Sequence, residues 1–132
     1  MRLGDPETKV ILPRIEADLF AHMDACVTGN LKSEMINVTD QSATTVMLVS
    51  GGYPEQYEKN KVMSGFEDIR DCIPFHAGTK EEAESILTNG GRVIALTALG
   101  DNYKDALALS YENTERISFE NKYYRKDIGF DL

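Results

Sequence analysis

Apolar residues in the first thirty positions recur with the spacing of helices. Between Val10 and Val27 they return every three or four residues, which aligns them on one face of a helix. Pro13 falls inside this pattern, and a proline lacks the N–H group that a helix interior needs. The pattern therefore predicts one short helix that ends near Pro13 and a longer helix that follows it.

The signals at either end of this helical region agree with that prediction. Asp5-Pro6-Glu7 combines an N-cap residue, a proline at the first helical position and an acidic residue in the first turn, which is typical of a helix start. Gly29-Asn30 is typical of a helix stop. The polar segment 28–42 lacks a clear period and predicts a connecting loop.

Two β-branched and apolar runs follow this loop. Residues 44–50 read Thr-Thr-Val-Met-Leu-Val-Ser and stop at a Gly-Gly-Tyr-Pro turn, so they predict a strand. Residues 72–77 predict a second, shorter strand that ends at Gly78. Because Pro74 cannot donate a ladder hydrogen bond, this strand is expected at a sheet edge or a bulge.

The last third of the chain predicts a hairpin and a helix. Two β-rich runs, 85–88 and 92–99, flank Asn89-Gly90-Gly91, and an Asn-Gly pair between such runs is a strong hairpin signal. Gly100-Asp101 then caps a helical pattern. Its mostly apolar face comprises Tyr103, Leu107, Ser110, Tyr111, Thr114 and Ile117.

Together these elements predict an α+β fold. We expect N-terminal helices, a small and mainly antiparallel sheet whose hairpins turn at glycines, and one C-terminal helix. Strands with short connections, bracketed by helices, favour this class over the alternating strands and helices of a doubly wound sheet.

Composition and charge narrow the classes of function. The 132 residues suffice for one domain, and 42% hydrophobic with 27% charged residues is ordinary for a globular protein. The net charge of −8 argues against broad nucleic-acid binding, which needs a basic face. No apolar run reaches the ~18 residues of a membrane span, and the first residues lack the apolar stretch of a signal peptide. We therefore expect a cytoplasmic protein without a nucleic-acid or membrane partner.

The cysteines and histidines form no recognisable catalytic or metal-binding set. Cys26 and Cys72 lie far apart without a CxxC pattern, so we interpret both as buried small hydrophobic residues. His22 falls in the helical region and is interpreted as a structural or surface residue. His76 ends a strand beside a glycine, where ligands often bind, but a hydrogen-bonded structural role is favoured over a catalytic one. No metal site is expected.

Three glycine turns at strand ends carry the most chemical information. They lie at 50–54, 76–80 and 88–92. Glycine lets backbone N–H groups approach an anion closely, and Lys80 and Arg92 each lie within two residues of such a glycine. Glycine turns with these cations suit a phosphate. The alternative interpretation is three ordinary turns with solvated charges.

Six ordered motifs carry a resemblance to a known family. They lie at 2–8, 50–54, 75–80, 88–93, 97–100 and 123–129. In this order they resemble the phosphoribosylamine–glycine ligases, also called glycinamide ribonucleotide synthetases, of the ATP-grasp superfamily. Any one motif would be a weak signal, whereas six in order over nearly the whole chain are specific. The stretches 53–65 and 80–87 match the family less closely.

The resemblance implies a C-terminal part of a longer enzyme. Residues 1–30 would be the helical end of the ATP-grasp region, and 31–132 the C-terminal domain, of the rudimentary single-hybrid type. The family uses ATP to join glycine to 5-phosphoribosylamine in purine biosynthesis, through an acyl phosphate of glycine. Its metal-binding Glu-x-Asn pair precedes the segment that matches Arg2. ATP and Mg²⁺ or Mn²⁺ would therefore belong to the complete enzyme, and this chain alone should bind no cofactor and show no ligase activity.

The resemblance also suggests site residues. Arg2 would hold the acyl phosphate or the glycine carboxylate, and Asp5 would orient an amine in addition to capping the first helix. The 5-phosphate of phosphoribosylamine would be bound by a second set, which comprises Lys80, Gly90, Gly91 and Arg92. Three further polar residues keep open roles: His76, Arg125 and Asp127.

Two other functions stay open at this point. The chain would bind a sugar phosphate without catalysis if it were a stand-alone module, or it would be a structural domain whose glycine turns are only turns. The apolar content of residues 10–27, which includes Val10-Ile11-Leu12, predicts an interface with the absent domains or self-association.

Overall fold

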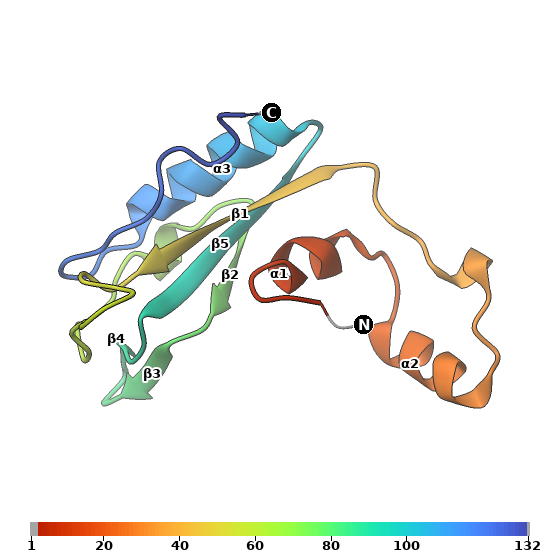
Figure 1. The fold of residues 1–132 in the computed structure, drawn as a ribbon, viewed down its shortest axis with the longest axis horizontal. Helices are drawn as coiled ribbons and strands as arrows, with labels where there is room; N and C mark the ends of the chain where they lie inside the picture. The colour runs from red at the N-terminus through yellow and green to blue at the C-terminus, as the bar shows by residue number, and fades with distance from the viewer. Residues whose placement is uncertain (1–2, 132) are drawn as a thin grey trace.

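The computed structural model describes residues 3–131 (Figure 1). Its helices and strands are, in chain order, α1 (Thr8–Ile11), α2 (Leu19–Thr28), β1 (Ser42–Val49), β2 (Cys72–His76), β3 (Thr79–Glu82), β4 (Ser85–Thr88), β5 (Arg92–Gly100) and α3 (Tyr103–Arg116). Short 3-10 turns lie at Leu12–Arg14, Ser33–Met35 and Phe66–Asp68. Helices at both ends and small antiparallel sheets confirm the predicted α+β class.

The larger sheet has the strand order β1-β5-β2, with both pairs antiparallel. β5 is the central strand, and its residues from Val93 to Ala98 are almost completely buried, as expected of an apolar run with both faces covered. β2 is an edge strand, where the missing N–H of Pro74 interrupts the fewest hydrogen bonds. The predicted edge position of Pro74 is confirmed.

The two faces of this sheet have different covers (Figure 1). α3 packs along one face of β1 and β5, and α1 contacts the same two strands from the other side. The principal core lies beneath α3 and comprises Leu48, Met63, Val93, Ile94, Leu96, Ile117 and Phe119. The face with α1 carries the cavity described below.

The buried face of α3 is more polar than the mostly apolar face that the sequence predicts. Its buried residues are Ala106, Ser110, Asn113 and Thr114. The Ser110 hydroxyl lies 2.9 Å from the hydroxyl of Thr44, and the Asn113 amide bonds both backbone groups of Arg70. Because their polar atoms are satisfied, these side chains are buried without a large penalty. The N-cap is Asn102, one residue after the predicted Gly100-Asp101.

The predicted hairpin between 85–88 and 92–99 is wrong. β4 pairs antiparallel with β3 in a separate two-stranded sheet. Its turn is Ala83-Glu84, whose φ angles of 48° and 63° suit a tight β-hairpin. The Asn89-Gly90-Gly91 segment instead connects β4 of the small sheet to β5 of the larger sheet. The Asn89 N–H donates to the carbonyl of Gly78 at 2.7 Å.

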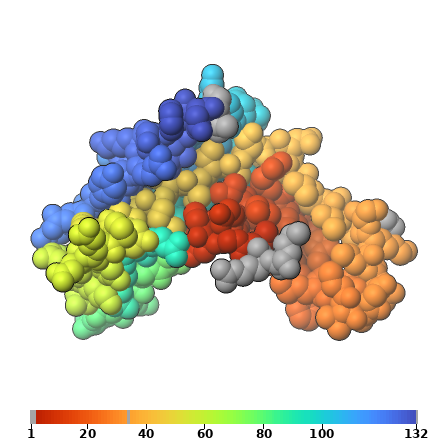
Figure 2. All heavy atoms as spheres, in the orientation of Figure 1, coloured from red at the N-terminus to blue at the C-terminus, as the bar shows by residue number. Residues whose placement is uncertain are grey.

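The N-terminal helices follow the prediction except at their start. Asp5 does not cap a helix, because α1 begins only at Thr8 and has no side-chain cap. Pro13 lies in the 3-10 turn after α1, where the sequence predicts a break between the two helices. α2 begins after the true N-cap Asp18 and ends at Gly29, whose φ is 72°. Figure 2 shows α2 projecting at one end of the molecule, away from α3.

Candidate functional site

Three of the six sequence motifs line a single cavity of about 320 Å³. They are the motifs at 50–54, 88–93 and 123–129, which are far apart along the chain. Strand β1 supplies the remaining wall. The lining residues are Met47, Val49, Tyr53, Pro54, Arg92, Tyr123, Tyr124 and Arg125. Most of this wall is aliphatic and aromatic, and Arg92 and Arg125 are the two charged residues among those that line it.

Arg92 reaches this cavity because the sheet has a register shift. Leu48 pairs with Ile94, but the next residue, Val49, pairs with Arg92 instead of Val93. A β-bulge of this kind re-aims a side chain. Regular alternation would leave Arg92 on the core face with Ile94, whereas the bulge places it beside Val49 at the cavity.

Arg92 is bonded to the N-terminal segment. Its Nη2 lies 3.3 Å from the carboxylate of Asp5, and its Nη1 donates to the Asp5 carbonyl at 3.1 Å. The Asp5 carboxylate also accepts a hydrogen bond from Lys9. That bond, and more weakly the charges of Lys9 and Arg92, hold the pKa of Asp5 below its usual value. The structure therefore joins a fourth motif, residues 2–8, to the cavity.

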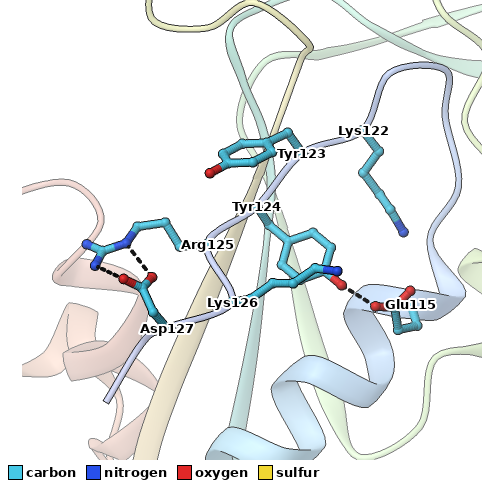
Figure 3. Close-up of a pocket in the computed structure, with 7 residues that line it drawn as sticks. All are labelled: Glu115, Lys122, Tyr123, Tyr124, Arg125, Lys126 and Asp127. Carbon is cyan, nitrogen blue, oxygen red and sulfur yellow. Dashed lines mark hydrogen bonds and ion pairs between the residues drawn. The ribbon is translucent and has the colours of Figure 1, made fainter. Parts of the chain in front are cut away.

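Arg125 faces the same cavity from the C-terminal tail. Its Nε and Nη2 each donate to Asp127, at 2.9 Å (Figure 3). This two-pronged bond lowers the pKa of Asp127 and raises that of Arg125. The guanidinium points away from Tyr124 and Glu115 in Figure 3. It is thus a second exposed, fork-shaped cation at the cavity.

Tyr124 and Lys122 hold this tail against α3 (Figure 3). The buried Tyr124 donates its hydroxyl proton to the carboxylate of Glu115, which raises the pKa of Tyr124 to about 12. Lys122 donates to the carbonyls of Thr114 and Ile117, at 2.9 and 2.6 Å. A shallow depression of about 840 Å³ lies over these residues. Because the polar atoms of Tyr124 and Lys122 already have partners on α3 or at its end, we assign these two residues a structural role.

Gly91 lets the 50–54 turn pack against the start of β5. A Cβ at Gly91 would overlap the ring of Tyr53, so only glycine fits beside this cavity-lining tyrosine. Ser50 bonds the same segment twice: its N–H donates to the carbonyl of Gly91 at 2.8 Å, and its hydroxyl donates to that of Gly90 at 2.9 Å. Gly90 and Gly91 therefore support the cavity wall through their backbone.

Lys80 lies apart from this group of residues. Its ammonium pairs with Glu82 at 2.6 Å within the small sheet, and no hydrogen bond or ion pair joins it to Arg92 in the part of the chain that the structure describes. The backbones of the two turns are nevertheless in contact, since Gly78 N–H donates to the Arg92 carbonyl at 2.8 Å. The structure thus brings the turns together and pairs their cations with different carboxylates.

The remaining candidates have local partners. His76 bonds the hydroxyl of Thr79 at 2.9 Å and stacks on Phe66, and His22 Nε2 lies 2.6 Å from the carbonyl oxygen of Met35. The predicted burial of Cys26 is wrong, because its position on the projecting α2 exposes it, while Cys72 is partly buried. Desolvation raises the pKa of Cys72 to about 11. Arg2 lies outside the described residues.

Sequence reasoning missed the cavity itself. Tyr53 and Tyr123 lie at its mouth, 39% and 61% exposed. Both belong to motifs that were recognised, but nothing in a single motif shows that another will face it. Each of the two motifs offered a signal in the sequence. In 50–54 a tyrosine, Tyr53, follows two glycines, and in 123–129 a tyrosine, Tyr123, lies close to Arg125.

Residues 3–131 contain neither a metal-binding cluster nor a membrane-spanning helix. No group of three or more His, Cys, Asp or Glu side chains there has the arrangement of a metal site. No described helix has the length and apolarity needed to cross a membrane.

Comparison with known proteins agrees with the sequence motifs. Residues 43–131 match the family model of the phosphoribosylglycinamide synthetase C domain. The phosphoribosylamine–glycine ligase of Caldanaerobacter subterraneus is 42% identical over 97% of this chain and 31% of its own length. A bifunctional purine biosynthetic protein of Dictyostelium discoideum is also 42% identical, over 97% of this chain and 16% of its own length.

A solved structure gives the same relationship in three dimensions. The crystal structure of phosphoribosylamine–glycine ligase from Thermotoga maritima superposes with a TM-score of 0.81 and 34% sequence identity, over 96% of this chain and 31% of that chain. The chain therefore spans about a third of the length of the ligases that it matches. With its cavity built from the motifs of that family, the chain belongs to the phosphoribosylglycinamide synthetase C-domain family.

Proposed function

We propose that this chain is the C-terminal part of an ATP-dependent ligase that joins glycine to 5-phosphoribosylamine in purine biosynthesis. Its contribution is part of the phosphoribosylamine site. The observation that carries this proposal is the convergence of family motifs on one cavity that Arg92 lines. The names of the relatives supply the reaction.

Arg92 is the principal phosphate-binding residue in this proposal. Its guanidinium is only partly covered, with 42% of the side chain exposed, and it offers several donors in a planar fork that matches a phosphate. Gly90 and Gly91 hold the turn that precedes it. Lys80 would approach the same phosphate only after leaving Glu82, an exposed partner to which it is weakly held.

Asp5 and Arg2 are proposed to act on the reacting groups. In the ligase reaction glycine's carboxylate becomes an acyl phosphate, the sugar amine attacks its carbonyl carbon, and phosphate leaves. A carboxylate such as Asp5 can accept a hydrogen bond from that amine and so orient it for attack. The bond between Asp5 and Arg92 supports this role, because it places the carboxylate next to the residue that would hold the other end of the same substrate.

ATP and a divalent metal are proposed for the complete enzyme. Both would be held by parts of the ligase outside this chain, and the absence of a metal-binding cluster among the described residues agrees with this for the metal. Within this proposal residues 1–30 form the helical end of the ATP-grasp region and 31–132 form the C-terminal domain. The cytoplasmic location expected from the sequence stays a prediction.

Joining this chain to the rest of a relative tests the function. The part of the Thermotoga maritima ligase that precedes the matched region would be fused ahead of residue 1, and formation of ADP and glycinamide ribonucleotide would be measured. We expect activity from the fusion and none from the chain alone. ADP formation by the chain alone, or a fusion that binds ATP but forms no product, would contradict the proposal.

A point variant sharpens this test. Arg92→Ala in the active fusion should weaken phosphoribosylamine binding by about 1.5–3 kcal/mol, the range for a hydrogen bond to a charged group. The ATP requirement should not change. Arg70→Ala is the matched control, because the guanidinium of Arg70 donates to the nearby backbone carbonyls of residues 67 and 69 and does not line the cavity. Equal Michaelis constants for the sugar amine in the Arg92 and Arg70 variants would show that Arg92 does not bind this substrate.

A further inference from the structure

The cavity that Arg92 lines has a second arginine among its lining residues. Arg125 lines the same space of about 320 Å³ and comes from the C-terminal tail. A guanidinium binds an anion readily, and either arginine could use a phosphate for this. Here each guanidinium is neutralised by its own aspartate, Asp5 for Arg92 and Asp127 for Arg125.

Both neutralising pairs are open to exchange. The side chains of Arg125 and Asp127 are 65% and 58% exposed, and exposed ion pairs contribute little free energy. Asp127 nevertheless occupies the Nε and Nη2 donors of Arg125 with parallel bonds of 2.9 Å. This is the geometry in which a guanidinium also binds two oxygens of a phosphate.

The rest of the cavity suits a small ring rather than a bare ion. Met47 and Val49 line it from β1, and Tyr53 and Tyr123 lie at its mouth. Small-molecule sites combine such apolar walls with a few convergent polar groups, and volumes of this size are at the lower end of their range. A pentose with one phosphate fits this description in size and in chemistry.

We propose that Arg125 is a binding residue for the phosphate of a phosphorylated pentose in this cavity, opposite Arg92, and that Asp127 occupies its donors until the phosphate replaces it. This inference rests on the proposed function and adds to it a second arginine and an internal competitor. It also gives different roles to the two cations near the glycine turns. Arg92 lines the cavity, whereas Lys80 pairs with Glu82 and does not line it.

Titration of the whole chain with ribose 5-phosphate, followed by two-dimensional amide NMR, tests the proposal. Ribose and inorganic phosphate serve as separate arms. We expect millimolar binding of ribose 5-phosphate, with shifts at 47–54, 91–93 and 123–127, and weaker binding of both fragments. Inorganic phosphate that binds as tightly as ribose 5-phosphate would overturn the assignment of a pentose.

Four variants address Arg125 and its competitor. Arg125→Gln should weaken ribose 5-phosphate binding about fivefold, the upper range for an exposed ion pair. Asp127→Asn should tighten binding about twofold, because it frees the guanidinium. Lys126→Gln and Asp24→Asn are the controls, since each makes the same change of charge at a residue that does not line the cavity. Both should bind like the wild type, and all variants should keep dispersed spectra.

The outcomes separate this inference from the proposed function. If Arg125→Gln binds like the wild type while Arg92→Gln is weakened, the role of Arg125 is overturned and that of Arg92 stands. If Asp127→Asn tightens binding no more than Asp24→Asn, the competition by Asp127 is overturned. If the wild type shows no shifts with ribose 5-phosphate, the cavity is not the pentose phosphate site. That result would overturn both the role of Arg125 and the placement of the phosphoribosylamine site in this cavity.

Discussion

The guanidinium of Arg92 lies 3.3 Å from the carboxylate of Asp5, although 87 positions separate the two residues. This bond ties the N-terminal segment to the first residue of the central strand. Arg92 lies inside the region that matches the family model, residues 43–131, and Asp5 lies outside it. The bond therefore links these two parts of the chain.

A double-mutant cycle between Asp5→Asn and Arg92→Gln should reveal this link. We expect a coupling of up to about 1 kcal/mol in the free energy of unfolding, because both side chains are half exposed. The coupling should shrink in high salt. Since the pKa of Asp5 is lowered in the fold, its contribution is present above the unfolded pKa and lost as pH falls. Urea denaturation at two salt concentrations measures it, and additive single effects would contradict it.

Gly91→Ala should destabilise the chain through Tyr53. The new Cβ would overlap the Tyr53 ring and lie 3.1 Å from that of Tyr57, and overpacking of this kind costs about 1–3 kcal/mol. Thermal or urea unfolding measures the loss. Tyr53→Ala should recover most of it in the double variant. Gly29→Ala is the comparison for backbone strain alone, since a Cβ there meets nothing within 4 Å while φ is 72°. A Gly91→Ala chain as stable as the wild type would refute this packing.

The class of fold was predictable from local patterns, but the pairing of strands was not. β1, β2 and β5 follow from β-branched runs, and α2 from its apolar period and Gly29. The Asn-Gly signal at 89–90 is also strong, yet it does not form a hairpin. The true hairpin turns at Ala83-Glu84, where no residue favours positive φ, so its stability comes from the flanking strands.

The candidate site was predictable only in part for a related reason. Arg92 stood out because it follows a glycine turn, and the family resemblance supplied Asp5. That these two residues bond each other depends on the register shift between Leu48 and Val49, which pairs Val49 with Arg92 and which a linear pattern does not encode. Lys80 had the same local signature as Arg92, but it lies in another sheet with Glu82 as its partner.

Lys122→Met should destabilise the end of α3. The Lys122 ammonium donates to two carbonyls at that end, and burial lowers its pKa. Methionine keeps the aliphatic length but leaves those carbonyls without this donor, at a cost of about 1–3 kcal/mol. Equilibrium unfolding measures the loss, and amide exchange should show faster opening of residues 114–117. Lys126→Met is the matched control, because Lys126 donates no hydrogen bond within the described chain. Equal effects of the two variants would contradict a capping role.

The isolated chain should self-associate through α2. Phe20, Met23 and Val27 lie on one stripe of this helix and are 78%, 57% and 88% exposed, a contiguous apolar surface of the kind that marks an interaction site. Sedimentation or light scattering over a range of concentrations should show oligomers. Phe20→Glu should shift the chain toward monomer, whereas Glu16→Gln should not. A wild-type chain that stays monomeric at high concentration would contradict this expectation.

Alkaline pH should weaken the fold through Tyr124. The hydrogen bond to Glu115 and the burial of the ring raise the pKa of Tyr124 to about 12, above its ordinary value of about 10 in an unfolded chain. The folded state therefore keeps the phenol proton at pH values where the unfolded state loses it. The stabilisation is complete below the unfolded pKa and is lost as pH rises from about 10 to about 12. Tyr124→Phe removes both the bond and the titration, so its stability should fall less steeply over that window than that of the wild type. Urea unfolding at several pH values measures the two slopes, with tyrosinate absorbance as an independent record of the pKa. Parallel slopes for the two proteins, or a Tyr124 that ionises with the exposed Tyr123, would show that the bond to Glu115 does not hold this proton.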